Sequence, residues 1–172
     1  YMYFGGIWGG QLQRWRNGAF NPNNPTSPTA FLPNDDEPAL LPFVAKMSDD
    51  LLEFAEKPVE VQILDERGKL LLAGDNERRF FEAAWVHKYN GKYYFSYSTG
   101  DTHFICYAIG DNPYGPFTYK GKILNPVVGW TSHHSICEFK GKWYLFYHDS
   151  SLSKGVTHLR SIKIAEIQYD ED

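Results

Sequence analysis

Apolar and polar residues alternate along the chain in short runs that are typical of β-strands. The alternation is clearest at Lys88–Tyr97, where two aromatic-rich runs flank a tight turn at Asn90 and Gly91. Two such runs around an Asn-Gly pair predict a β-hairpin. The same arrangement returns about fifty residues later at Glu138–Tyr147, with Gly141 in the turn. The chain therefore carries two copies of one hairpin.

The segments that follow the two hairpins also correspond. Apolar runs at His103–Ile109 and Phe117–Lys120 follow the first hairpin, and runs at His158–Ile164 and Ala165–Tyr169 follow the second. Four short antiparallel strands that recur every ~50 residues form one blade of a β-propeller. The pattern therefore predicts an all-β propeller.

The start of the chain predicts the remainder of an earlier blade. Tyr1–Phe4 resembles the second strand of a hairpin, and Pro42–Ser48 and Val59–Leu64 would supply two more strands. Between them, Arg16–Leu41 is rich in Asn and Pro and predicts a long loop insertion over one face. We therefore expect a single domain in which three segments hold the rest of one blade with its insertion, the next blade and the last blade: about 1–75, 76–128 and 129–172.

About two and a half blades fall short of the four or more that a closed ring needs. An open stack would leave an apolar blade face and an unpaired strand edge in water at each end. We therefore expect this segment to dock against polypeptide that supplies the remaining blades, in the same chain or as a companion fragment.

Charge and hydropathy argue against two classes of partner. The chain has 17 Lys and Arg against 21 Asp and Glu, a net charge of −4, and no basic block that could neutralise phosphates. Apolar stretches such as Leu70–Ala73 are far shorter than the roughly 20 residues of a membrane-spanning helix. We therefore expect neither nucleic-acid nor membrane binding. The run Tyr1–Phe4 is not a targeting signal, so the sequence leaves open a cytoplasmic or a secreted location.

The two cysteines, Cys106 and Cys137, lie inside apolar strand-like runs. They lack the paired spacing of a zinc site or of a disulfide framework. The sequence therefore predicts two buried thiols.

Two residues of the earlier blades are candidates for chemistry. Glu82 is a single carboxylate at the head of an apolar strand, between two Phe and two Ala residues. An apolar setting raises the pKa of a Glu toward neutrality, as a general acid requires, and the alternative is a strand-end carboxylate that points to solvent. Trp8, in the glycine-rich run Gly5–Gly10, can stack on a sugar ring or pack into the core at a bulge.

In the next repeat, the corresponding strand begins with Thr131-Ser132-His133-His134-Ser135. The first strands of neighbouring blades line the axis of a propeller, so polar groups from both strands are expected to converge. Adjacent strand residues point to opposite faces, so at most one of His133 and His134 faces the axis. The alternative is a buried, hydrogen-bonded histidine.

Several motifs occur along the chain in a fixed order: Phe81–Trp85 before the Asn-Gly hairpin, Tyr97–Gly100, Asn112–Phe117, and Ser132–Ser135 before Gly141–Tyr144. Together they resemble glycoside hydrolase family 43. The resemblance runs from Tyr1 to Asp172 and corresponds to the later part of the family's catalytic domain. It implies a five-bladed β-propeller and a β-xylosidase, α-L-arabinofuranosidase or arabinanase activity.

The resemblance implies roles for four side chains. Glu82 matches the general acid that protonates the leaving glycosidic oxygen. His133, favoured over His134 by its register, matches an axial histidine that contacts a metal ion or a water near the sugar. A hard cation such as Ca²⁺ would keep mostly water ligands there, because one imidazole is a poor sole ligand for it. Trp8 resembles an aromatic residue of the substrate pocket, and Arg160 resembles an arginine of the last blade that reaches the site.

The resemblance also places two carboxylates outside this sequence. The family's general base is an Asp near the start of its first blade, and a second Asp, which orients the acid, lies shortly before the position matched by Tyr1. Inversion needs two carboxyls roughly 6.5–9.5 Å apart with a water between them, so this segment alone is expected to be inactive. The hypothesis is the C-terminal part of an inverting glycosidase that acts on xylosyl or arabinofuranosyl linkages of hemicellulose-derived oligosaccharides. The alternative is a non-catalytic carbohydrate-binding propeller fragment.

Overall fold

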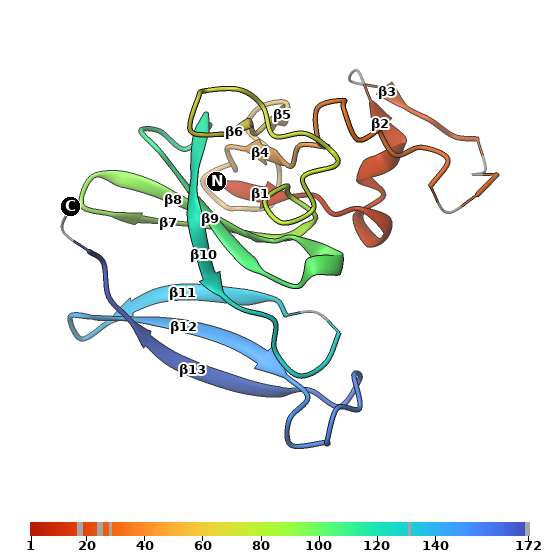
Figure 1. Cartoon of the computed structure of the whole chain (residues 1–172). Helices are drawn as coiled ribbons and strands as arrows, with labels where there is room; N and C mark the ends of the chain where they lie inside the picture. Colours follow the sequence, from red (N-terminus) through yellow and green to blue (C-terminus); the bar gives the residue numbers. More distant parts are fainter. Residues whose placement is uncertain (17–18, 24–25, 28, 131, 171–172) are drawn as a thin grey trace.

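The computed structural model describes residues 1–16, 19–23, 26–27, 29–130 and 132–170. In these residues, three sheets follow one another in the order β1-β4-β5, β6-β10-β9-β8-β7 and β11-β12-β13, beside a small β2-β3 hairpin (Figure 1). The strands are β1 (Met2–Phe4), β2 (Trp15–Arg16), β3 (Ala19–Phe20), β4 (Phe43–Ala45), β5 (Val59–Glu60), β6 (Ile63–Leu64), β7 (Glu82–Tyr89), β8 (Lys92–Ser98), β9 (Ile105–Gly110), β10 (Phe117–Leu124), β11 (His134–Phe139), β12 (Lys142–Asp149) and β13 (Ser161–Ile167). Short 3₁₀ helices are η1 (Trp8–Gly10), η2 (Leu12–Arg14) and η3 (Gly100–Thr102). No helix among the described residues is long and apolar enough to cross a membrane.

The largest sheet contains the first predicted hairpin. β7 and β8 pair in antiparallel register around Asn90 and Gly91, which both have a positive φ, as a type I′ turn requires. β9 and β10 add to the hairpin in chain order. β9 begins at Ile105 rather than at His103, and β10 continues to Leu124. The predicted order of four antiparallel strands is confirmed for this sheet.

The segment predicted as one strand at Val59–Leu64 serves two sheets. Its first part, β5, pairs with β4, and its last part, β6, runs parallel to β10 in the largest sheet. The change of partner takes place at Val61 and Gln62. The Val61 N–H donates to the Pro42 carbonyl, and the Gln62 carbonyl accepts the Phe117 N–H. One extended segment therefore ties the first two sheets together.

The last sheet departs from the prediction. β11 and β12 form the second hairpin around Lys140 and Gly141, as expected. The prediction of two strands at His158–Ile164 and Ala165–Tyr169 is wrong, because the single strand β13 runs across both and pairs with β12 along its length. No Gly or Pro interrupts this segment, so no turn residue favours a break between the two predicted strands.

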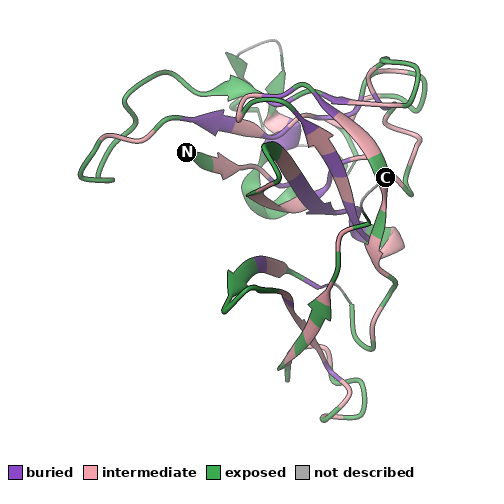
Figure 2. Cartoon of the chain, turned by 90° about the vertical axis from the view of Figure 1, so that its left-hand side faces the viewer, coloured by how far each residue is buried: buried purple, intermediate pink, exposed green. Residues whose placement is uncertain are grey.

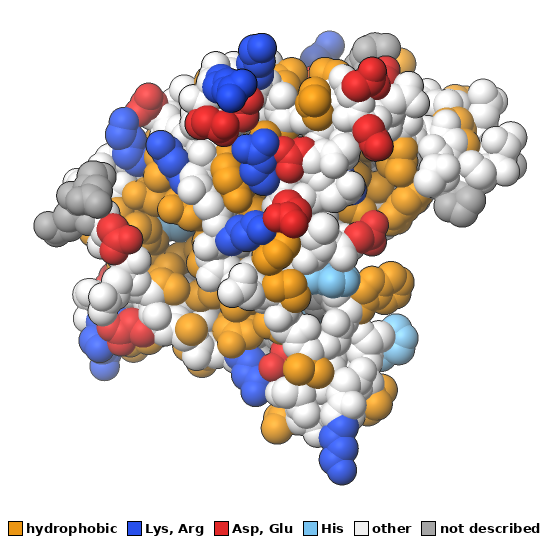
Figure 3. All heavy atoms as spheres, in the orientation of Figure 1, with side chains coloured by type: hydrophobic (Ala, Val, Ile, Leu, Met, Phe, Trp, Pro, Cys, Tyr) orange, Lys and Arg blue, Asp and Glu red, His pale blue; other side chains and the backbone are white. Residues whose placement is uncertain are grey.

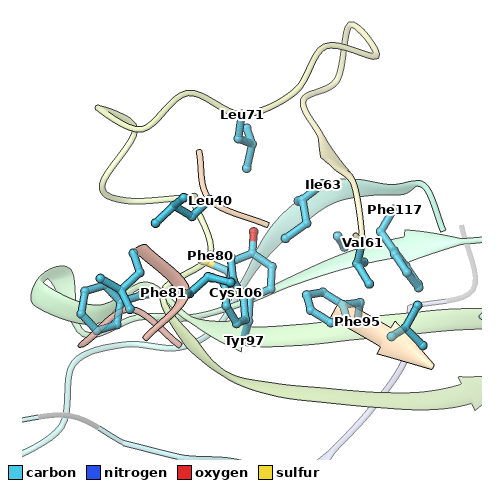
Figure 4. Close-up of a cluster of buried hydrophobic side chains, with 14 residues drawn as sticks. Leu40, Val61, Ile63, Leu71, Phe80, Phe81, Phe95, Tyr97, Cys106 and Phe117 are labelled. Carbon is cyan, nitrogen blue, oxygen red and sulfur yellow. The ribbon is translucent and has the colours of Figure 1, made fainter. Parts of the chain in front are cut away.

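The hydrophobic core lies between the first two sheets (Figure 4). Fully buried side chains come from β4, β8, β9, β10 and the sheet-switching segment, and they include Val44, Val61, Phe95, Tyr97 and Phe117. Burial of rings and branched side chains of this kind contributes roughly 1.5–3 kcal/mol each to folding. Figure 2 shows that buried positions gather in these two sheets, whereas β13 alternates between intermediate and exposed positions. The last sheet thus lies outside the main core.

Hydrogen bonds join the largest sheet to the last one. The Trp85 indole N–H on β7 donates to the Ile136 carbonyl on β11 at 3.1 Å. On the neighbouring strand β8, the Ser96 hydroxyl lies 2.6 Å from Nε2 of His134. These two contacts fix β7 and β11 side by side.

The segment after β13 crosses back to the β7–β8 hairpin (Figure 1). The Tyr169 ring stacks on Tyr89 with centroids 3.7 Å apart, and its hydroxyl lies 2.5 Å from Nε2 of His87. Burial lowers the pKa of His87 to about 4, so this ring is neutral near pH 7 and can accept a hydrogen bond from the Tyr169 hydroxyl. An aromatic contact therefore joins the last sheet to the largest one at its outer end.

The cysteines differ in exposure. Cys106 is buried, as predicted, and burial raises the pKa of its thiol to about 11. Cys137 is exposed, so the prediction of a buried thiol is wrong at this position. Side chains of a strand alternate between its two faces, and on β11 it is Ile136 that takes the buried position.

Candidate active site

Glu82 stands at the head of β7, at a break in the strand pairing. The register shifts between Glu82 and Trp85, so that Ala83 and Ala84 together face one residue of β8. Ala83 has a φ of 61°, in the left-handed region, which costs a non-glycine residue about 1–2 kcal/mol. This arrangement is a β-bulge, which bends a strand and redirects a side chain beside it. The bulge therefore sets the direction of Glu82.

Glu82 meets His133, which lies just before β11 in the neighbouring sheet. Oε1 of Glu82 is 3.3 Å from Nε2 of His133. The Glu82 side chain is 23% exposed and that of His133 is 53% exposed. Two residues selected from the sequence are therefore in contact, and both remain accessible from solvent.

His134 points away from this pair. Its Nε2 lies 2.6 Å from the Ser96 hydroxyl, between the two sheets. Burial lowers the pKa of His134 to about 3, so its ring is neutral near pH 7. Of the two adjacent histidines, His133 is thus the one beside Glu82. Thr131, the first residue of that motif, lies outside the described residues.

A third histidine, His148 on β12, holds the main chain of this loop. Its Nε2 accepts the His133 N–H at 3.0 Å. The Ser132 hydroxyl donates to the His148 carbonyl at 2.9 Å and accepts the His148 N–H at 3.2 Å. Burial, followed by the charges of Arg160 and His133, lowers the pKa of His148. The sequence offered no signal for His148, which looks like one more residue of an aromatic strand.

Arg160 lies on the exposed segment before β13. Its Nε donates to the Thr157 carbonyl at 3.0 Å. Its positive charge contributes to the lowered pKa of His148, so the guanidinium lies on the side of the site formed by the last sheet. The structure thus brings Arg160 near His148.

Trp8 lies in a tight glycine-rich loop close to Glu82. The Ile7 N–H donates to the Phe81 carbonyl at 3.0 Å, which fixes this loop to the start of β7. A Cβ atom on Gly6 would lie 3.6 Å from Cβ of Glu82. Trp8 itself has a φ of 61° and is 39% exposed. An accessible indole therefore stands on a loop that is anchored beside the candidate acid.

The predicted loop insertion, Arg16–Leu41, contains strand β3, which pairs with β2 in a short hairpin. A cavity of about 300 Å³ lies at this hairpin, and its lining includes Arg14, Phe20 and Phe31. Neither Glu82 nor His133 lines it. This cavity is therefore separate from the contact between the carboxylate and the imidazole.

A known protein family matches most of the chain. Residues 42–172 match the family described as Glycosyl hydrolases family 43. The chain belongs to glycosyl hydrolase family 43.

Relatives of this family-43 chain have related names. It is 66% identical over 172 residues to a xylosidase/arabinosidase of Bacteroides ovatus, covering 100% of this chain and 51% of that protein. It is 60% identical over 180 residues to xylosidase/arabinosidase 43A of Humicola insolens, covering 100% of this chain and 53% of that protein. The chain thus spans about half the length of the curated relatives it matches.

Solved family-43 structures share the fold. A β-xylosidase/α-arabinofuranosidase from a compost metagenome, in complex with xylotriose, superposes with a TM-score of 0.92 at 65% identity, covering 98% of this chain and 51% of that one. An enzyme of Xanthomonas citri complexed with xylotriose gives a TM-score of 0.91 at 58% identity, covering 98% and 49%. The predicted all-β architecture, part of a family-43 propeller, is confirmed.

The family-43 chain offers limited ligands for a metal ion. Among the described residues, no group of three or more His, Cys, Asp or Glu side chains is arranged to hold one. Ca²⁺ takes six to eight oxygen ligands, whereas the ring of the candidate residue His133 offers only nitrogen atoms. The half-exposed His133 ring leaves room for waters or for ligands from other polypeptide. The compost enzyme was solved in a form described as calcium-free.

Proposed function

We propose that the chain is the C-terminal part of an inverting glycosidase that cleaves xylosyl or arabinofuranosyl linkages in hemicellulose-derived oligosaccharides. The contact between Glu82 and His133, at 3.3 Å, carries the proposal, because it joins two candidate residues from neighbouring sheets in one accessible place. The names of the relatives and the bound xylotriose in two solved structures support this substrate class.

Glu82 is proposed as the general acid. Its protonated carboxyl would give a proton to the glycosidic oxygen as the bond from this oxygen to the anomeric carbon breaks. The carboxylate left behind lies 3.3 Å from Nε2 of His133, and a proton on this nitrogen would stabilise it, because charge-assisted hydrogen bonds are stronger than neutral ones. General acid catalysis of this kind is worth about 10²–10⁴-fold in rate.

The general base is proposed to lie on polypeptide that completes the propeller. An inverting reaction needs a second carboxyl roughly 6.5–9.5 Å from the first, with the attacking water between them. The relatives are about twice as long as this chain, which leaves room for the missing blades. The segment alone is therefore expected to be inactive.

Exposed apolar side chains on the last sheet support the proposal that a neighbouring blade is missing. Ile162 and Ile164 on β13 are 78% and 61% exposed, and Leu152 and Leu159 in the preceding loop are also exposed. Figure 3 shows hydrophobic side chains on the surface of this part of the molecule. A neighbouring blade would cover them. Sedimentation of the segment tests this assembly. We expect to find the segment bound to the polypeptide that supplies the remaining blades. A cooperatively folded monomer of the segment alone would contradict the proposal.

Three further side chains are proposed to serve the sugar. Trp8 would stack on a sugar ring and Arg160 would donate hydrogen bonds to hydroxyl groups. His133 would hold a hard cation such as Ca²⁺, which would polarise water or hydroxyls near the axis when bound. Because the other ligands are mostly water, calcium binding should be weak in a calorimetric titration.

His133→Ala should reduce the turnover of the completed enzyme without unfolding it. Wild-type turnover in this variant would remove His133 from the site.

Hydrolysis itself separates the proposal from a binding-only propeller. The complete protein should release xylose or arabinose from oligosaccharides, and proton NMR should show first-formed product with inverted anomeric configuration. Binding of xylotriose without any turnover would leave the non-catalytic alternative. Retention of configuration would refute the inverting mechanism.

A further inference from the structure

We infer that His148 is a positioning residue for the proposed reaction, because its imidazole Nε2 accepts the main-chain N–H of His133 and so holds the His133 ring against Glu82. The inference rests on the proposed function and adds a residue to it. His148 acts through the loop that carries His133.

The contact replaces a missing strand hydrogen bond. The ladder between β11 and β12 begins where His134 lies opposite Tyr147. One step further, His133 has left the strand, while β12 continues through His148 to Asp149. The side chain of His148 turns back and accepts the His133 N–H at 3.0 Å. The main chain can therefore leave the sheet at His133 without losing its partner.

The same end of the last sheet holds the loop before β11 at several points. The Ser150 N–H donates to the Val128 carbonyl at 2.8 Å, and the Trp130 N–H donates to the Thr157 hydroxyl at 2.9 Å. Ser132 is bound by the main chain of His148. Along this series, the bond from His133 to the His148 ring is the one next to Glu82. His148 thus holds the main chain at His133, the residue of this loop that contacts Glu82.

The ring makes this contact at a cost. An imidazole that accepts at Nε2 carries its proton at Nδ1. The Nδ1 atom of His148 is buried and has no hydrogen-bond partner among the described residues. An unsatisfied buried donor destabilises a protein. A histidine here is therefore better explained by the placement of His133 than by stability of the sheet.

Two variants in the complete enzyme separate an acceptor from a space-filling role. His148→Gln can place an amide oxygen near the position of Nε2, whereas the shorter side chain of His148→Asn reaches only the level of Nδ1. We expect His148→Asn to lower kcat on xylobiose on the order of tenfold with a smaller change in KM, the size expected for one lost hydrogen bond. His148→Gln should stay within about threefold of the wild type. Equal losses in the two variants, or no loss in either, would overturn the inference.

A double-mutant cycle tests whether His148 acts through His133. In the His133→Ala background the ring to be positioned is gone, so His148→Asn should cause little further loss of kcat. Additive losses would refute the positioning role. The Glu82→Gln variant separates this inference from the proposed function. If Glu82→Gln abolishes hydrolysis of xylobiose while His148→Asn leaves it unchanged, only the role of His148 fails; if Glu82→Gln has no effect, the proposed function fails.

Discussion

The indole N–H of Trp85 donates to the carbonyl of Ile136 at 3.1 Å, from one innermost strand of the structure to the next. Trp85 lies on the same strand as Glu82, and Ile136 lies on the strand that follows His133. This contact therefore links the strand that begins at Glu82 to the strand that follows His133.

Replacing Trp85 with Phe keeps most of the ring and removes the indole donor. The Ile136 carbonyl would lose its partner, and we expect the melting temperature to fall by about 2–4 °C, corresponding to roughly 1 kcal/mol. Activity on xylobiose should fall as well, because β7, which begins at Glu82, and β11, which follows His133, lose one of the contacts that hold them side by side. Thermal scans of the complete enzyme measure the first effect. Trp130→Phe is the matched control, because Trp130 is mostly exposed, and equal shifts in both variants would contradict the account.

The bulge at Ala83 predicts an unusual order of stability among substitutions at this position and the next. Ala83 has a positive φ, so Ala83→Gly should be nearly neutral, whereas β-branched Ala83→Val should lower stability by about 1–2 kcal/mol and misdirect Glu82. Ala84 has no such φ, and Ala84→Gly should destabilise the fold by roughly 0.5–1 kcal/mol. Urea denaturation of the three variants checks this order. A loss on Ala83→Gly as large as that on Ala84→Gly would mean that the backbone at Ala83 is ordinary.

The contact between His87 and Tyr169 predicts a pH-dependent stability. Burial lowers the pKa of His87 from 6.5 to about 4, so between these values the unfolded chain binds a proton that the folded chain does not. The contribution of neutral His87 to the free energy of unfolding is fully present above pH 6.5. It is lost as the pH falls toward 4, and the loss is no more than about 3 kcal/mol. Denaturation at pH 7.5, 5.5 and 4.5 should show a shallower decline in His87→Phe than in the wild type. Parallel declines would exclude His87 as a source.

Local patterns predicted the hairpins because alternation and turn chemistry act between neighbours in the sequence. The turn at Asn90 and Gly91 forms as expected, and Glu82 stands at the head of its strand. The switch of sheets at Val61 depends on which strands lie on either side, and that information is not local. The single strand β13 replaced two predicted strands because the repeat was extended to a segment that lacks turn residues.

Part of the candidate site was predicted from the sequence. Glu82 was selected because it is a single carboxylate at the head of an apolar strand, and His133 was favoured over His134 through the family resemblance; the fold brings the two side chains into contact. The bulge at Ala83 has no sequence signature, because alanine is not a residue that favours a positive φ. His148 was missed because its contact is made across strands to a main-chain atom of the loop. Chemistry at side chains was therefore easier to predict than the contacts that position them.

The role of Glu82 as general acid is the central claim, and Glu82→Gln in the complete enzyme tests it most directly. The amide keeps the shape of the side chain but cannot donate the catalytic proton. Xylobiose, whose leaving group needs protonation, should then be hydrolysed about 10²–10⁴-fold more slowly. A nitrophenyl xyloside, whose leaving group departs with little help, should lose much less. The control is Glu60→Gln, the same change on an exposed strand, which should leave both rates unchanged.

The deciding measurement is the ratio of the two losses in kcat/KM, together with the pH profile of Glu82→Gln. The account predicts a much larger loss on xylobiose than on the nitrophenyl xyloside, and a basic limb that flattens because the acid that set it is gone. Equal losses on the two substrates with an unchanged pH profile would contradict the account and give Glu82 a structural or binding role.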